Sequence, residues 1–301
     1  MTQKNHSVRL TLLAALLVPA FSAAAQAGTP ADAARADINA TYGFVPGFLK
    51  ALPDNALPGA WAEMKQFADA NTALPNKVKD MIGLAVSAQT GSRSSIYAYS
   101  RCAQAFGASE AEVKEAVTMA ALTRHWSTIF NGLQLDEARF RAELGKMFDY
   151  LGKMAAGKVP APKDIAITDA RSVNEDVKQM FGFVPEFVQR VPAEALPGAW
   201  VELKSVEMNP ETAIPPKYKS LIGLAVSSQI PCRYCIIADT EFAKGDGATE
   251  REINEAITMA GLTRHWITLA DGLQLDEKQF RKDIDRLLQG AASKGPVAKA
   301  R

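Results

Sequence analysis

The feature of this sequence that most limits its possible folds is an internal repeat. Short segments from the first half of the 301 residues recur in the second half at an offset of 139 or 140 residues. The recurring segments are GFVP (43–46, 182–185), LPGAW (57–61, 196–200), IGLAVS (82–87, 222–227), LTRHW (122–126, 262–266) and GLQLDE (132–137, 272–277). Such self-similarity predicts two copies of one structural unit. We place the copies at residues 28–157 and 158–301.

Each copy has the pattern of a set of helices. Apolar side chains recur at helical spacing between residues 76 and 88, which is typical of a packed helix. Ser109 and Thr249 are each followed by Glu three residues later, which is the capping-box pattern of a helix start. Sustained alternation of apolar and polar residues, the usual sign of a strand, does not occur. We therefore predict an all-α fold in which two tandem helical repeats form a bundle.

The amino terminus has the pattern of a secretory signal. Basic residues precede an apolar run at 10–21, and Ala25-Gln26-Ala27 matches a cleavage site. We predict that residues 1–27 are removed after export to the periplasm; a retained anchor is the alternative. Removal leaves 32 basic and 33 acidic residues, a formal charge of −1. Because near-neutral chains without a basic cluster attract polyanions weakly, we expect no nucleic-acid partner and no membrane contact after cleavage.

Cys232 and Cys235 form a C-x-x-C pair directly after an apolar run. Pro231 fits the first position of a new helix, where a missing N–H costs nothing. The two cysteines would then share one helical face at a helix start, which favours negative charge on at least one sulfur. This placement indicates redox chemistry. Cys102 stands alone, and we expect it to be a buried small apolar side chain.

Comparison of the two copies identifies candidate functional residues. At an offset of 140, Cys232 and Cys235 align with serines, and Asp239 aligns with Tyr99. A residue found only in the second copy is the better functional candidate. Asp239 lies one turn after Cys235 and could accept its proton or raise its pKa; an exposed helix carboxylate is the alternative.

The two histidines after residue 27 occupy matching positions in the copies. His265 could act as a general base or activate a thiolate. However, His125 lies in a copy that has no dithiol. A histidine packed beside the neighbouring tryptophan is therefore the alternative for both.

The second copy resembles a known family. Residues 214–226, the Cys-x-Tyr-Cys segment at 232–235 and the helix opened by Thr249 are similar to the carboxymuconolactone decarboxylase superfamily, and the cysteine motif resembles its AhpD-like alkylhydroperoxidase branch. The resemblance implies a helical bundle that forms homo-oligomers and reduces hydroperoxides with electrons from a thiol protein. It also implies that Cys235 attacks and Cys232 resolves. Ser220 and Asp239 stand where the family's relay has glutamate and histidine.

We therefore predict an exported dithiol oxidoreductase or peroxidase that acts on hydroperoxides or partner disulfides. The predicted catalytic residues are Cys235, Cys232, Asp239 and His265, with no cofactor and no resident metal. Three alternatives remain at this point. The same four side chains could bind Zn or Cu. The cysteines could instead form a plain structural disulfide, or the chain could be a decarboxylase-type enzyme.

Overall fold

The computed structural model describes residues 28–293, so the predicted signal peptide lies outside the described residues. Within the described range the chain forms fourteen α-helices and one π-helical turn, and no strand. The prediction of an all-α fold is therefore confirmed. No helix of this range is both long and apolar enough to cross a bilayer.

The first copy contains seven α-helices and the π-helical turn η1. They are α1 (Pro30–Tyr42), α2 (Gly47–Lys50), α3 (Leu57–Glu63), η1 (Met64–Ala68), α4 (Asn76–Thr90), α5 (Arg93–Ala105), α6 (Glu110–Leu133) and α7 (Glu137–Ala155). The second copy repeats this order. It comprises α8 (Ala170–Phe181), α9 (Glu186–Arg190), α10 (Leu196–Val206), α11 (Pro216–Gln229), α12 (Arg233–Gly245), α13 (Glu250–Gly272) and α14 (Glu277–Ser293). The boundary that we predicted at residue 157 falls in the loop between α7 and α8.

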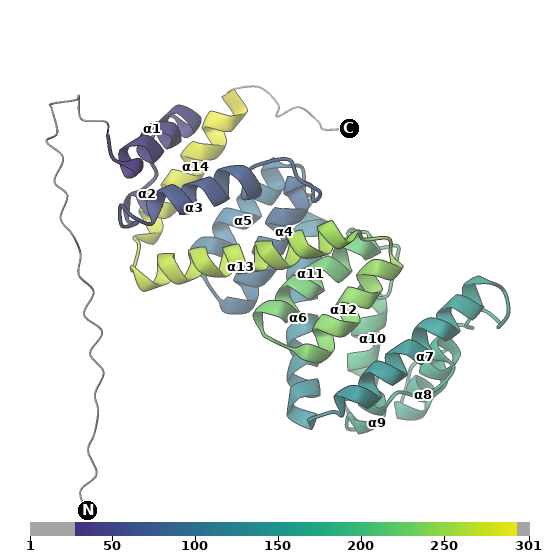
Figure 1. The fold of residues 1–301 in the computed structure, drawn as a ribbon. Helices are drawn as coiled ribbons and strands as arrows, with labels where there is room; N and C mark the ends of the chain where they lie inside the picture. The colour runs from purple at the N-terminus through teal and green to yellow at the C-terminus, as the bar shows by residue number, and fades with distance from the viewer. Residues whose placement is uncertain (1–27, 294–301) are drawn as a thin grey trace, which may run out of the picture.

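Helices α4, α6, α11 and α13 form the centre of the molecule, where both copies share one core (Figure 1). Residues 81–87 of α4 and 219–227 of α11 are buried without interruption. A helix that is buried on all sides needs apolar or small residues all round, and the repeated segment IGLAVS provides them. The capping boxes predicted at Ser109 and Thr249 are both formed, and they begin α6 and α13.

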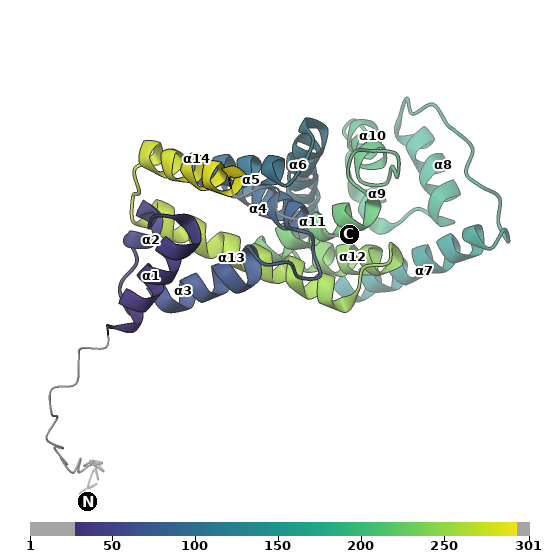
Figure 2. The same ribbon diagram turned by 90° about the horizontal axis from the view of Figure 1, so that it is seen from above.

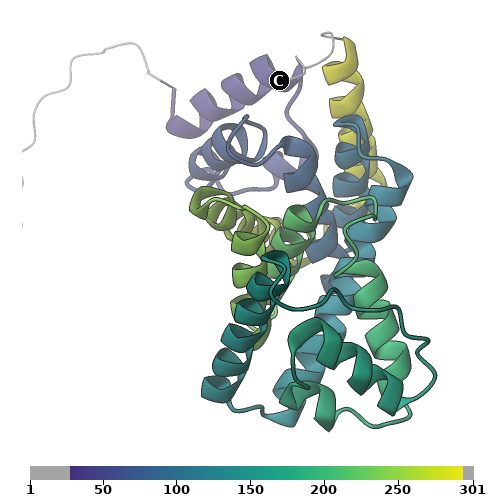
Figure 3. The same ribbon diagram turned by 90° about the vertical axis from the view of Figure 1, so that its right-hand side faces the viewer.

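The last helix of each copy leaves its own copy and packs on the other. Helix α14 lies against α5, α2 and α1, whereas α7 lies against α12 and α8. As a result α1–α3 and α14 gather at one end of the molecule and α7–α10 at the opposite end (Figure 2). Figure 3 looks onto the end built from α7–α10, whose teal and green helices lie in front. Each end is thus built from both copies.

Two equivalent glutamates fasten the copies together. Glu115 on α6 accepts hydrogen bonds of 2.6–3.2 Å from residues 212–214, in the loop that leads into α11. Glu255 on α13 accepts hydrogen bonds of 2.7–3.0 Å from residues 72–74, in the loop that leads into α4. Hydrogen bonds to a charged acceptor are the stronger kind. Each copy therefore holds the start of the other copy's central helix.

Candidate active site at the dithiol

Cys232 and Cys235 lie at the start of α12. The helix begins at Arg233, with Cys232 as its N-cap residue. The prediction that Pro231 is the first helical residue was therefore wrong, because the Cys232 sulfur takes the capping role and accepts a hydrogen bond from the backbone N–H of Cys235 at 3.4 Å. Both cysteines are free thiols, and their exposed fractions are 0% and 5%.

The two thiols differ in how readily they ionise. Hydrogen bonds donated by Cys235, with smaller ones from Tyr234 and Asn131, lower the pKa of Cys232 to about 7 against the opposing effect of burial. The pKa of Cys235 is raised, first by its hydrogen bond to Cys232 and then by burial. When the pair loses one proton, the negative charge therefore lies mainly on Cys232, at the N–H groups of the helix start.

Cys235 lines a cavity of about 390 Å³, whereas Cys232 does not line it. A volume of this size is within the usual range for small-molecule sites. The first copy provides part of the wall, through Trp126 on α6 and Phe140 on α7. This sharing follows from the exchanged packing of α7. Neither copy alone would enclose the cavity.

Asp239 lies in the same cavity, one turn of α12 after Cys235. It is 7% exposed, so the alternative of an exposed carboxylate was wrong. Burial, followed by the nearby charge of Glu207, raises its pKa well above the usual value, and its Oδ2 atom has no hydrogen-bond partner. Gly223 on α11 leaves room for this carboxyl, since a Cβ there would lie 3.1 Å from Asp239 Oδ1.

Glu207 is a cavity residue that the sequence reasoning did not identify. It follows α10 directly and lines the cavity with Cys235 and Asp239. Burial raises its pKa to about 7, although the charge of Lys219 opposes this. At the earlier offset of 139 its counterpart is Ala68. The comparison of the copies therefore held a signal for Glu207, since only the second copy has a carboxyl there.

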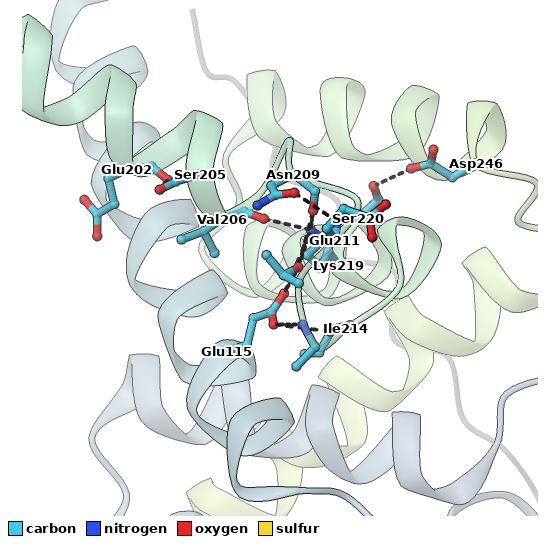
Figure 4. Close-up of polar contacts among 12 residues, drawn as sticks. Glu115, Glu202, Ser205, Val206, Asn209, Glu211, Ile214, Lys219, Ser220 and Asp246 are labelled. Carbon is cyan, nitrogen blue, oxygen red and sulfur yellow. Dashed lines mark hydrogen bonds and ion pairs between the residues drawn. The ribbon is translucent and has the colours of Figure 1, made fainter. Parts of the chain in front are cut away.

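A buried lysine holds the segment that carries Glu207 (Figure 4). Lys219 Nζ donates to the Val206 carbonyl at 2.7 Å, to the Asn209 carbonyl and to Thr212 Oγ1 at 2.8 Å. Because these oxygens accept its hydrogens, the ammonium group positions the loop instead of facing the cavity. In the first copy Lys79 donates to the two matching carbonyls, those of Phe67 and Ala70.

Ser220 and Asp246 complete the polar part of the cavity. Ser220 Oγ donates to Asp246 Oδ2 at 3.3 Å, and burial raises the pKa of Asp246. Ser220 and Asp239 both line the cavity. These are the two positions at which the sequence departs from the proton relay implied by the family resemblance, and the fold places both at one cavity.

The structure does not bring His265 to the thiols. His265 is exposed on α13, where its ring lies 5.4 Å from that of Trp266, and it does not line the dithiol cavity. The reason is that α6 of the first copy packs against α11 and α12 and borders the dithiol cavity, whereas no residue of α13 lines it. In the described part of the chain, no group of three or more His, Cys, Asp and Glu side chains is arranged to hold a metal ion. The four candidate metal ligands are thus not assembled.

The fold and this site define a tandem helical repeat with one dithiol cavity. The family model of the carboxymuconolactone decarboxylase family matches residues 55–138 and again residues 194–278. The chain belongs to this family and contains two copies of its domain, as the internal repeat predicted.

Other comparisons add little detail. No curated protein matches the chain. A crystal structure from Burkholderia xenovorans, provisionally named a gamma-carboxymuconolactone decarboxylase subunit, is similar with 16% identity and a TM-score of 0.49. The match covers 88% of this chain and 97% of that one.

Proposed function

We propose that the protein is an AhpD-like dithiol peroxidase that reduces uncharged organic hydroperoxides at Cys235 and Cys232. The observation that carries the proposal is the opening of the Cys235 thiol onto a cavity of about 390 Å³, with a second thiol in the same helical turn. A peroxidase of this kind needs one sulfur that meets the substrate and one that resolves the product.

The lining of the cavity favours an uncharged substrate. Among the described residues that line it there is no Lys, Arg or His, whereas four carboxyls are present, those of Glu143, Glu207, Asp239 and Asp246. An anionic substrate would therefore lack a counter-charge. The aromatic walls suit an apolar group. Because Cys235 is only 5% exposed, a small hydroperoxide fits this site better than the disulfide of a partner protein.

The proposed reaction uses the shared proton of the dithiol. A proton moves from Cys235 to Cys232, and the Cys235 thiolate attacks the terminal oxygen of the hydroperoxide. The O–O bond breaks, Cys235 becomes a sulfenic acid, and the leaving alkoxide takes a proton from Glu207 to form the alcohol. Glu207 then accepts the Cys232 proton, and the Cys232 thiolate attacks the Cys235 sulfur. The departing hydroxide recovers that proton and leaves as water, and a disulfide remains.

A thiol protein would return the disulfide to the dithiol and would itself become oxidised. Because Cys232 is fully buried, this step requires the turn between α11 and α12 to open. We further propose that the protein works in the periplasm and as a homo-oligomer, as its amino-terminal sequence and its family resemblance suggest.

The test is a count of free thiols after addition of cumene hydroperoxide, an uncharged organic peroxide. Wild-type protein should lose two thiols per chain, and Cys102 should survive because burial raises its pKa. Cys232→Ser should lose at most one thiol and stop at the sulfenic acid, and it should react more slowly than wild type because serine cannot take the Cys235 proton. Cys235→Ser is the matched control; thiol loss in this variant at the wild-type rate would reject the proposal.

A decarboxylase-type activity is the second candidate. The raised pKa values of Glu207 and Asp239 favour it, because buried carboxyls of this kind can move protons to and from a substrate. The two candidates make opposite predictions for the thiols. A proton-transfer enzyme would keep its activity when both cysteines of the dithiol are replaced by serine.

A further inference from the structure

The first copy contains a second cavity at the position that corresponds to the dithiol cavity. Its volume is about 160 Å³, and it lies between α4 and α5 of the first copy and α13 and α14 of the second. Ser95 stands where the second copy has Cys235, and Tyr99 stands where it has Asp239. The first copy therefore contains a cavity at the equivalent position but lacks the two cysteines.

Two polar atoms at this cavity lack partners. Asp80 Oδ2 and Trp266 Nε1 are both buried without a hydrogen bond, and both residues line the cavity. Buried polar groups in native proteins nearly always have partners, since an unpaired one costs about 1–3 kcal/mol. The hydroxyl groups at this cavity take part in hydrogen bonds, and the free thiol of Cys102 also lines it. Tyr42 donates to Asp69 at 2.5 Å, and Tyr99 accepts from Thr263 at 3.3 Å.

The size and charge of the cavity limit what can fill it. A cavity of about 150 Å³ is known to accept benzene, so this one has room for about one ring. The remaining lining is apolar, as at Phe48, Met259 and Leu269, and the described lining residues include no Lys, Arg or His. A negatively charged ligand would lose its hydration without gaining a counter-charge. The carboxyls of Asp69 and Asp80 also line the cavity, and burial raises the pKa of both, which favours their neutral forms and an uncharged ligand.

We propose that this cavity binds an uncharged, ring-sized organic molecule that carries a hydroxyl group. The ring occupies the apolar space, and the hydroxyl accepts a hydrogen bond from Trp266 Nε1 and donates one to Asp80 Oδ2. Burial raises the pKa of Asp80 well above the usual value. Because this favours the neutral carboxyl, Asp80 needs no positively charged partner. The site is separate from the dithiol cavity and does not depend on the peroxidase proposal.

The test uses two fluorinated probes of one size, 4-fluorophenol and fluorobenzene, with binding to the full chain followed by ¹⁹F NMR. Ala98 lines this cavity and its counterpart Ala238 lines the dithiol cavity. Ala98→Phe therefore fills the proposed site, and Ala238→Phe is the matched control. We expect 4-fluorophenol to bind to Ala238→Phe as to wild type and to bind much more weakly to Ala98→Phe.

Asp80→Leu, made in the Ala238→Phe protein, tests the hydroxyl contact. It should weaken the binding of 4-fluorophenol by about tenfold, which corresponds to the loss of one hydrogen bond. The affinity for fluorobenzene should stay unchanged. Trp266→Phe should also weaken the binding of 4-fluorophenol. It replaces Asp80→Leu in the test if circular dichroism shows that Asp80→Leu does not fold. The proposal is overturned if wild type binds neither probe, if Ala98→Phe binds 4-fluorophenol normally, or if the folded variants weaken both probes equally.

Discussion

Glu207 shows how burial alone can turn an ordinary residue into a candidate proton carrier. A glutamate in water is charged at neutral pH, but Glu207 has a pKa of about 7 because its charged form is poorly solvated. In this position it can both give and accept a proton under physiological conditions. Lys219 keeps its backbone in place without pairing fully with its charge.

The raised pKa of Glu207 makes a prediction about stability. Between its ordinary value of 4.5 and about 7 the folded protein holds a proton that the unfolded chain has lost. Stability should therefore fall as pH rises through this window and level off above it, by at most about 3 kcal/mol from this residue. Urea unfolding at pH 5 and pH 8 measures the change.

Glu207→Gln is the control, because glutamine cannot titrate. It should show a smaller loss of stability between pH 5 and pH 8 than wild type; what remains would belong to other buried acids such as Asp239, whose pKa is also raised. An equal loss in both proteins would contradict the assignment. The same variant should reduce hydroperoxide more slowly, since the alkoxide would lack its proton donor.

At the scale of helices, α4 and α11 each contain a glycine against which a side chain of the next helix packs. Gly83 on α4 lies under the ring of Tyr99, and Gly223 on α11 lies under the carboxyl of Asp239. A Cβ at Gly83 would come within 2.4 Å of the ring, whereas at Gly223 the nearest atom would be 3.1 Å away. The equivalent glycine thus leaves room for a tyrosine ring in the first copy and for a smaller carboxyl group in the second.

These glycines provide a matched pair of substitutions. Gly83→Ala should destabilise the protein by about 1–3 kcal/mol, the usual cost of overpacking. Gly223→Ala should be close to neutral, because the gain in helix propensity of about 1 kcal/mol offsets a milder contact. Urea unfolding at one pH compares them. A Gly83→Ala protein as stable as wild type would show that the ring of Tyr99 can move freely.

The whole molecule is best described as two interlocked copies. Helix α7 covers α12, helix α14 covers α5, and the clamps of Glu115 and Glu255 cross between the copies in both directions. Both cavities therefore depend on both copies. This arrangement gives the copy without a dithiol a physical role, since α6 and α7 form part of the wall around Cys235.

Interlocking predicts that the chain can be cut without falling apart. A protease site inserted in the exposed loop at 158–164, between α7 and α8, should yield two fragments that elute together in size-exclusion chromatography. They should also keep the reaction of the dithiol with hydroperoxide that we propose for the intact chain. A cut form of Glu115→Ala combined with Glu255→Ala should separate at a lower urea concentration. Fragments that elute apart without urea would refute the interlocked arrangement.

The properties that depend on local chemistry could be predicted from the amino-acid sequence alone. The repeat, the helical spacing and the capping boxes at Ser109 and Thr249 were enough for an all-helical duplicate, because helices form from contacts a few residues apart. The C-x-x-C spacing was also enough to place Cys232 and Cys235 at one helix start. Asp239 was identified because it lies one turn away.

Which side chains share a cavity depends on how the helices of the two copies pack together. Helix spacing does not state which copy a helix packs against, so the exchange of α7 and α14 could not be deduced from the pattern. The exchange brings Phe140 of α7 to the dithiol cavity, and the packing of α6 against α11 and α12 brings Trp126 there, whereas His265 on α13 stays exposed. Likewise, Glu207 has an unusual pKa only because distant segments bury it. Burial depends on the packing of the whole chain, and local sequence does not encode it.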